Sequence, residues 1–128
     1  MTDRGVDAML ARARASLDRV TPQQAAAAVT TDGALLVDIR PAAQRAQHGE
    51  VPGALVIERN DLEWRLDPAC DACLPAADSY DRPVLVLCQE GYASSLAAVA
   101  LRDLGLRRAT DVIGGYRAWR EAGLPTTR

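Results

Sequence analysis

The feature that most constrains this chain is the alternation, from Gly33 onward, of short apolar runs with segments of helical spacing. The apolar runs are too short for buried helices and suit strands that are covered on both faces. They occupy residues 34–38, 54–57, 84–88 and 109–113, and the helical segments occupy residues 41–47, 62–66, 93–104 and 115–122. The alternation is typical of an α/β fold, and we expect a parallel sheet of about five strands flanked by helices.

Two helices are expected before the first strand. Residues 1–20 should form an N-terminal extension, since apolar residues recur at helical spacing from Val6 to Val20; we expect an amphipathic helix that packs on the body of the protein. The run Thr21-Pro22-Gln23-Gln24 offers an N-cap, a Pro at the first helical position and a Gln in the capping-box position. It predicts a second helix, ending near Val29, at the start of a domain of residues 21–128.

Composition excludes several classes of function. The chain has 128 residues, enough for one domain, and its 48% apolar content and net charge of −2 are typical of a globular protein without a nucleic-acid partner. It contains no Lys, which excludes Schiff-base chemistry and the Lys-dependent phosphate loop. His48 is the only histidine, which excludes a site that needs two imidazoles.

The sequence also indicates where in the cell the protein is located. No apolar block forms in the first twenty residues, and no later run approaches the length that spans a bilayer. The cysteine count is 3, and an odd number without a signal sequence indicates a reducing compartment with free thiols. We therefore expect a cytoplasmic protein with no membrane partner.

Cys88 has the strongest signs of chemistry. It ends an apolar run, and a short loop with Gly91 separates it from a helix that begins near Ala93 or Ser94. The carboxyl ends of parallel strands form the ligand-binding edge of a sheet, and amides of such a loop and helix start can converge on a sulfur and stabilise a thiolate. The Ser94 hydroxyl could bind the sulfur or cap the helix. A buried packing role is the usual one for a free cysteine, but it needs neither this loop nor this helix start.

These residues also carry a family resemblance. Cys88-Gln-Glu-Gly91-Tyr-Ala-Ser94 resembles the Cys-x-x-Gly-x-x-Ser loop of the rhodanese-type sulfurtransferases. Two further segments, residues 36–54 and 114–125, are similar to the signatures that flank that loop in the family, and the likeness covers roughly residues 21–125. It implies a rhodanese-like sheet and an enzyme that works without a cofactor, in which Cys88 takes a sulfane sulfur from a small-molecule or protein donor and passes it to a thiol or other acceptor.

The resemblance also implies a substrate site built by the loop. We assign the catalytic role to Cys88 and the cradle to the amides of Gln89, Glu90, Gly91, Tyr92, Ala93 and Ser94. Many members carry Arg where this chain has Gln89 and Ala93, and a His where it has Glu50; Glu90 adds a negative charge. Thiosulfate should therefore be a weak donor, with a cysteine or protein persulfide at least as suitable. Without the family's histidine, His48 is a weak candidate for a general base.

Cations that bind an anionic donor at the pocket mouth could come from outside the cysteine loop. Arg59 and Arg65 lie just after the second strand, with Trp64 as a candidate apolar wall, although an ordinary surface helix explains them equally well. Asp38 and Arg40 close the first strand and are expected to be structural. Cys70 and Cys73 form a Cys-x-x-Cys pair in a Pro-flanked loop, where redox or zinc roles have weak support and a sulfur relay with Cys88 is the sharper hypothesis.

Two alternative functions can be compared with sulfur transfer. A cysteine phosphatase or arsenate reductase needs Arg at the sixth position after its cysteine, and that position is Ser94. A rhodanese-like module for binding or sulfur sensing would fit the altered loop charges, but the intact Cys88, Gly91 and Ser94 frame favours an enzyme.

Overall fold

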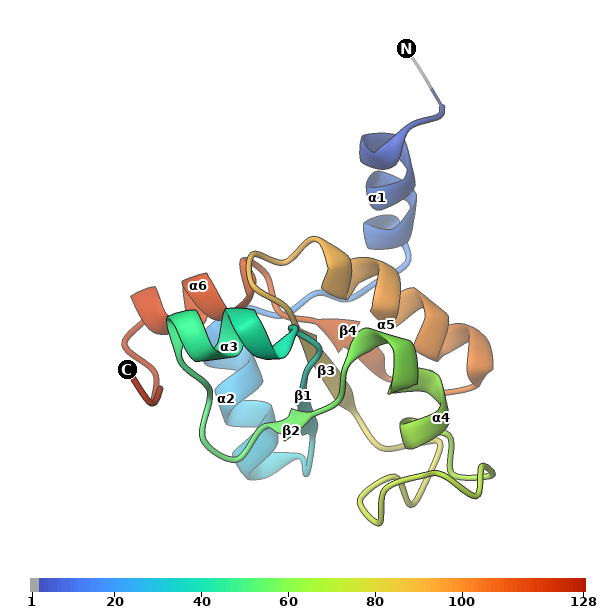
Figure 1. Ribbon diagram of the computed structural model, residues 1–128. Helices are drawn as coiled ribbons and strands as arrows, with labels where there is room; N and C mark the ends of the chain where they lie inside the picture. Colours follow the sequence, from blue (N-terminus) through green and yellow to red (C-terminus); the bar gives the residue numbers. More distant parts are fainter. Residues whose placement is uncertain (1–2) are drawn as a thin grey trace.

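The computed structural model describes residues 3–128, and its centre is a parallel sheet (Figure 1). The strands are β1 (Leu35–Asp38), β2 (Leu55–Val56), β3 (Val84–Leu87) and β4 (Ala109–Asp111), in the order β2-β1-β3-β4. All pairings are parallel, with Val37 opposite Val86 and Val86 opposite Asp111. A single bridge between Val20 and Val112 extends the sheet beyond β4. The predicted α/β class is confirmed, with four strands and this bridge in the place of a fifth.

In residues 3–128 six α-helices accompany the sheet. Their bounds are α1 (Val6–Ala15), α2 (Pro22–Thr31), α3 (Ala42–His48), α4 (Leu62–Leu66), α5 (Ala93–Leu104) and α6 (Gly115–Glu121), and a 3-10 turn, η1 (Arg59–Asp61), precedes α4. The predicted capping box of α2 is present, with Thr21 and Gln24 bonded reciprocally.

Successive side chains along each strand point to opposite faces of the sheet, so the core is divided into two layers. Leu35 and Val37 of β1 pack on the side of α4 and α5, where Leu62 and Leu101 complete the cluster. Leu36 and Leu85 face the opposite side, where α2 and α6 cover the sheet. Both faces are therefore apolar, as the short continuous runs predicted.

The N-terminal helix differs from its expected form. Helix α1 ends at Ala15 instead of continuing to Val20, because the following residues extend so that Val20 can pair with β4. Ala13 and Leu17 are buried against the body, but Val6 is 71% exposed, so the start of the predicted apolar stripe is uncovered. Figure 1 shows α1 projecting from the body beside α5.

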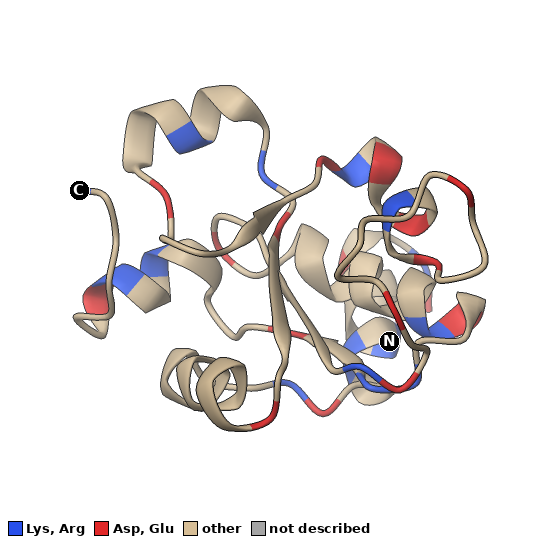
Figure 2. Ribbon diagram, turned by 90° about the horizontal axis from the view of Figure 1, so that it is seen from below, with Lys and Arg blue, Asp and Glu red and all other residues tan. Residues whose placement is uncertain are grey.

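Basic and acidic residues are interspersed along the helices and loops in the view of Figure 2. Within the described residues no helix combines the length and apolar character needed to cross a membrane.

Candidate active site

Cys88 follows β3 directly and has two backbone amides aimed at its sulfur. Sγ accepts hydrogen bonds from the Gly91 amide at 3.2 Å and from the Ser94 amide at 3.3 Å. Gly91 has a φ of 88°, a left-handed conformation that brings its amide round to the sulfur and that glycine adopts without strain. Ser94 lies in the first turn of α5, where backbone amides lack helical partners. Charge-assisted bonds from these amides stabilise a thiolate more than a thiol.

The Ser94 side chain does not act as predicted. Its hydroxyl donates to Asp111 Oδ2 at 2.8 Å and does not bind the sulfur. It does not cap α5 either, because the N-terminus of that helix has no side-chain cap. The expected role of this hydroxyl is therefore wrong, and it is the Ser94 amide that binds Cys88. Of the expected cradle of amides from Gln89 to Ser94, those of Gly91 and Ser94 make the hydrogen bonds to the sulfur within the described chain.

A cavity of about 340 Å³ opens in front of Cys88. The loop contributes Gln89, Glu90, Tyr92 and Ala93 to its lining, and the segment that follows β1, helix α3 and η1 contribute the rest of the wall. Cys88 is only 7% exposed, but it lines this cavity and can be approached through it. Of the two candidate cations, Arg59 lines the cavity. Arg65 lies outside the lining, and its guanidinium donates to the Ala72 carbonyl.

Arg40 is a buried cation in the cavity wall, and its guanidinium donates its hydrogen bonds to groups of the protein itself. It forms an ion pair with Asp38 at 2.7 Å and donates to the Gly49 carbonyl at 2.9 Å, in keeping with the structural role expected of both residues. Its guanidinium also lies 4.0 Å from the centre of the Tyr116 ring and donates to Gln89 Oε1 at 3.0 Å. Arg40 thus fixes the Gln89 side chain within the wall.

The other charges in and next to this cavity are paired. Arg59 Nη1 lies 2.7 Å from Glu63 Oε1, and Glu90 Oε2 lies 3.1 Å from Arg117 Nη1. Hydrogen bonds to Glu90 and then to Glu121 raise the pKa of Arg117 above its ordinary value, so Arg117 keeps its charge across the working pH range. An anionic substrate must therefore compete with carboxylates for these guanidinium groups.

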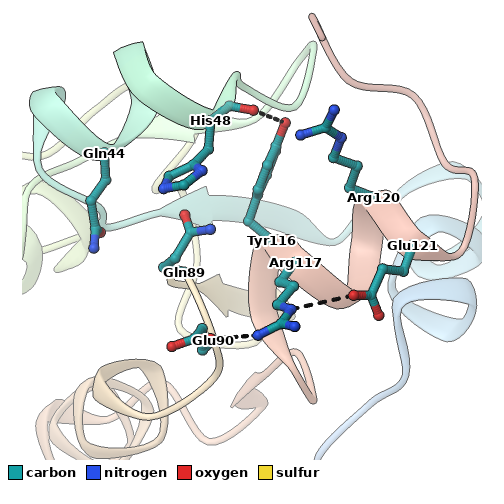
Figure 3. A pocket seen from close by; sticks show the side chains of 8 residues that line it. All are labelled: Gln44, His48, Gln89, Glu90, Tyr116, Arg117, Arg120 and Glu121. Carbon is teal, nitrogen blue, oxygen red and sulfur yellow. Dashed lines mark hydrogen bonds and ion pairs between the residues drawn. The ribbon is translucent and has the colours of Figure 1, made fainter.

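A second pocket, of about 660 Å³, adjoins the cavity and is the one drawn in Figure 3. The two share Gln44, Gln89 and Glu90. His48 lines this second pocket and is absent from the lining of the Cys88 cavity. The hypothesis that His48 acts as a general base for Cys88 therefore gains no support from its position. Trp64, 59% exposed, lines a further hollow beside Arg59.

The start of α6 holds the loop from one side. The Tyr116 amide donates to the Cys88 carbonyl at 2.8 Å, and the Arg117 amide donates to the Gln89 carbonyl at 3.1 Å. Gly115 makes this approach possible, because a Cβ at this position would collide with the Cys88 carbonyl and lie 2.8 Å from the Gly91 amide nitrogen. Its φ of 61° also favours glycine.

Sequence reasoning missed the residues behind the loop. Asp111 is fully buried and accepts hydrogen bonds from the hydroxyls of Ser94 and Ser95, while Arg19 forms an ion pair with it at 2.9 Å. One signal was available, since a carboxylate within an apolar strand must have buried partners. Arg14 and Arg19 gave no such signal, because their partners lie more than seventy residues away.

Cys70 and Cys73 lie apart from this site. Their loop follows α4 and leads into the amino end of β3, whereas Cys88 follows its carboxyl end (Figure 1). Cys73 packs against the core cluster beneath α4 and α5. The structure does not bring these thiols to Cys88, so the hypothesis of a sulfur relay loses its basis. Across residues 3–128 no group of three or more His, Cys, Asp or Glu could hold a metal ion.

The model of the rhodanese-like domain family matches residues 21–122. The chain belongs to this family. Thiosulfate sulfurtransferase GlpE of Actinobacillus succinogenes is 31% identical over 83% of this chain and 86% of its own length, and GlpE of Glaesserella parasuis is 33% identical over 83% and 89%. The predicted family, and the rhodanese fold with it, are confirmed.

A solved structure extends the likeness beyond the rhodanese-like domain. It is a protein of unknown function from Rhodopseudomonas palustris, described as a possible tyrosine phosphatase. It is 32% identical, with a TM-score of 0.85 over 98% of this chain and 96% of its own. That coverage includes most of the segment before residue 21.

Proposed function

We propose that the protein is a sulfurtransferase in which Cys88 carries a sulfane sulfur between a donor and a nucleophilic acceptor. The observation that carries the proposal is the pair of amides directed at a sulfur that lines an open cavity. The GlpE relatives, named thiosulfate sulfurtransferases at about 30% identity, support the same reaction class.

The reaction divides into two displacements at sulfur. The Cys88 thiolate attacks the sulfane sulfur of the donor; a bond forms between Sγ and that sulfur, the donor's sulfur–sulfur bond breaks, and its electron pair leaves with the donor as sulfite or a thiolate. An acceptor thiolate or cyanide then attacks the outer sulfur, which breaks the bond to Sγ and regenerates the Cys88 thiolate. The Gly91 and Ser94 amides stabilise the anion on Sγ at the start and the end of the cycle. Neither step needs a metal or an organic cofactor.

The charges around the cavity favour a persulfide donor over thiosulfate. Thiosulfate is a dianion, and loop residues 89–94 contain no Arg or Lys. Arg59 in the cavity lining is paired with Glu63, Arg117 of the adjoining pocket is paired with Glu90, and Arg40 is engaged within the wall. We infer that a small-molecule or protein persulfide is the better donor and that the acceptor is a thiol. Such exchange belongs in the reducing cytoplasm, where the three free cysteines stay reduced.

The geometry does not favour a phosphatase. Those enzymes hold a tetrahedral oxyanion with an Arg in the cysteine loop, and this loop has Ser94 in that position, with its hydroxyl turned back to Asp111.

Steady-state turnover tests the proposal. Thiosulfate and glutathione persulfide are supplied separately as donors, cyanide is the acceptor, and thiocyanate is measured after subtraction of the rate without protein. We expect turnover with both, with a higher kcat/KM for the persulfide. No turnover with either donor would contradict the assignment as an enzyme and indicate a binding or sensing module. A higher kcat/KM for thiosulfate would overturn the choice of donor.

A further inference from the structure

The segment before the rhodanese-like domain reaches the back of the Cys88 loop. Arg14 Nη2 donates to the Gly91 carbonyl at 2.7 Å, and Arg19 Nη2 donates to the same oxygen at 3.2 Å. Gly91 supplies one of the two amides that bind Cys88 Sγ. Two guanidinium groups from outside residues 21–122 therefore hold a residue that contacts the sulfur directly.

The second amide is held by the same segment through Asp111. The hydroxyls of Ser94 and Ser95 each donate to Asp111 Oδ2 at 2.8 Å. Arg19 donates to Asp111 Oδ1 at 2.9 Å and to Oδ2 at 3.2 Å. The Asp111 side chain is 0% exposed, so its oxygens depend on partners within the protein, and Arg19 is the cation among them. Arg19 thus supports Ser94 through one intermediate residue.

Backbone pairing places Arg19 beside these groups. The Val20 amide donates to the Asp111 carbonyl at 3.1 Å, and the Ile113 amide donates to the Val20 carbonyl at 2.8 Å. Arg14 is fixed separately, since its Nε donates to Ser95 Oγ at 3.2 Å and its guanidinium lies 5.7 Å from the centre of the Tyr92 ring. Each guanidinium makes several contacts, which favours one defined position.

We propose that Arg14 and Arg19 are positioning residues for the chemistry of Cys88. Neither touches the sulfur. They fix Gly91 and, through Asp111, Ser94, so that both amides point at Sγ, and they place positive charge behind a loop that has no cation of its own. The proposal rests on the proposed function for its role in sulfur transfer, while its effect on the Cys88 thiol can be measured without any sulfur donor.

The first test is Arg14→Gln in the full chain, in a background with Cys70→Ser and Cys73→Ser so that Cys88 is the only thiol. The rate of alkylation by iodoacetamide is measured across pH. We expect the profile to move to higher pH, because weaker amide alignment disfavours the thiolate. We also expect kcat/KM for sulfur transfer to fall roughly three- to tenfold.

Arg12→Gln is the matched control. Arg12 lies on the same helix, but its guanidinium donates to the Asp3 carbonyl. This variant should reproduce the parent's pH profile. The charged residues in the lining of the Cys88 cavity, Arg40, Arg59 and Glu90, are the same in all variants, so a displaced profile is assigned to the segment behind the loop.

The second test is Arg19→Lys, because Arg19→Gln would leave Asp111 without a cation and endanger folding. Lysine keeps the charge but lacks the planar fork with which Arg19 binds both Asp111 oxygens and the Gly91 carbonyl. We expect a folded protein with an upward displacement of the profile. Profiles of Arg14→Gln and Arg19→Lys that both coincide with that of Arg12→Gln, in folded proteins, would overturn the proposal. If the parent transfers no sulfur but the profiles still differ, the positioning role stands and the proposed function fails.

Discussion

Two loops at opposite ends of β3 carry the thiols of this protein, and they surround sulfur in different ways. In the Cys88 loop, two amides converge on Sγ at 3.2 and 3.3 Å, and a twelve-residue helix follows. In the loop of Cys70 and Cys73, Cys70 Sγ accepts one amide bond, from Ala72 at 3.4 Å, and the Cys73 thiol lies 4.0 Å from the Pro68 carbonyl. The more buried thiol is the one with the convergent donors.

The difference teaches that the exposure of a sulfur is a poor guide to how well its surroundings would stabilise a thiolate. Cys70 and Cys73 are each more exposed than Cys88. A nucleophilic sulfur needs donors that stabilise its anion and a cavity that admits the substrate, and both are found at Cys88. The variants below break or sharpen this contrast.

Substitution of the cysteines should give the largest difference. Cys88→Ser is expected to reduce sulfur transfer to the rate without protein, because a hydroxyl is a far weaker nucleophile than a thiolate. Its free energy of unfolding should change by no more than about 1 kcal/mol. The double variant Cys70→Ser/Cys73→Ser should retain normal turnover. Equal losses in both proteins would erase the contrast between the loops.

Gly115→Ala should have the next largest effect. The added methyl group collides with the Cys88 carbonyl and crowds the Gly91 amide, and the backbone there has a positive φ. We expect a loss of about 3 kcal/mol in the free energy of unfolding and a fall in kcat/KM of about a hundredfold. Denaturant unfolding and turnover measure the two quantities.

Gly123→Ala is the control for backbone strain. Gly123 also has a positive φ, of 78°, but a Cβ there meets nothing within 4 Å. It should lose some stability and keep its turnover. If the two alanine variants lost turnover to the same degree, the close approach of α6 to the loop would have no special importance.

Prediction from sequence succeeded where a pattern is local. The strands and most helix bounds follow from short apolar runs and caps, and the convergence of amides on Cys88 Sγ follows from a loop and a helix start that are contiguous in the chain. The end of α1 was mispredicted because the pairing of Val20 with β4, a tertiary contact, overrode helical periodicity.

The support behind the loop could not be predicted for the same reason. Arg14, Arg19 and Asp111 are brought together by the path of the chain around α5, and no spacing in the sequence joins them. The sequence predicts a Ser94 hydroxyl that binds the sulfur or caps the helix, and only the fold brings Asp111 within 2.8 Å of it.

Glu90→Gln should give a small effect that is specific to the Cys88 loop. It removes the negative charge at the mouth and frees Arg117 from one carboxylate, so the KM for thiosulfate should fall about two- to threefold at low salt. Glu121→Gln frees the same guanidinium from a carboxylate outside the loop and should have a smaller effect. An unchanged KM in Glu90→Gln would show that the Glu90 charge does not influence which donor the protein prefers.

Tyr80→Phe should give the smallest effect, confined to the other loop. The Tyr80 hydroxyl donates to Asp67 Oδ1 at 2.6 Å, and this bond holds the pKa of Asp67 below its ordinary value. The stability it adds is therefore complete above the ordinary range of an Asp carboxyl and is lost as pH falls through the lowered pKa. Turnover should be unchanged. Thermal unfolding of both proteins should differ slightly at neutral pH and converge in acid; a difference that grows in acid would contradict the assignment.

Intact-protein mass spectrometry of two complementary variants is the most direct measurement of the central claim. Cys88→Ser and the Cys70→Ser/Cys73→Ser double variant are each incubated with glutathione persulfide, freed of donor and weighed before and after reduction. The account predicts a gain of one sulfur atom, removed by reduction, in the double variant and no gain in Cys88→Ser. A sulfur that is carried by Cys88→Ser and absent from the double variant would contradict it.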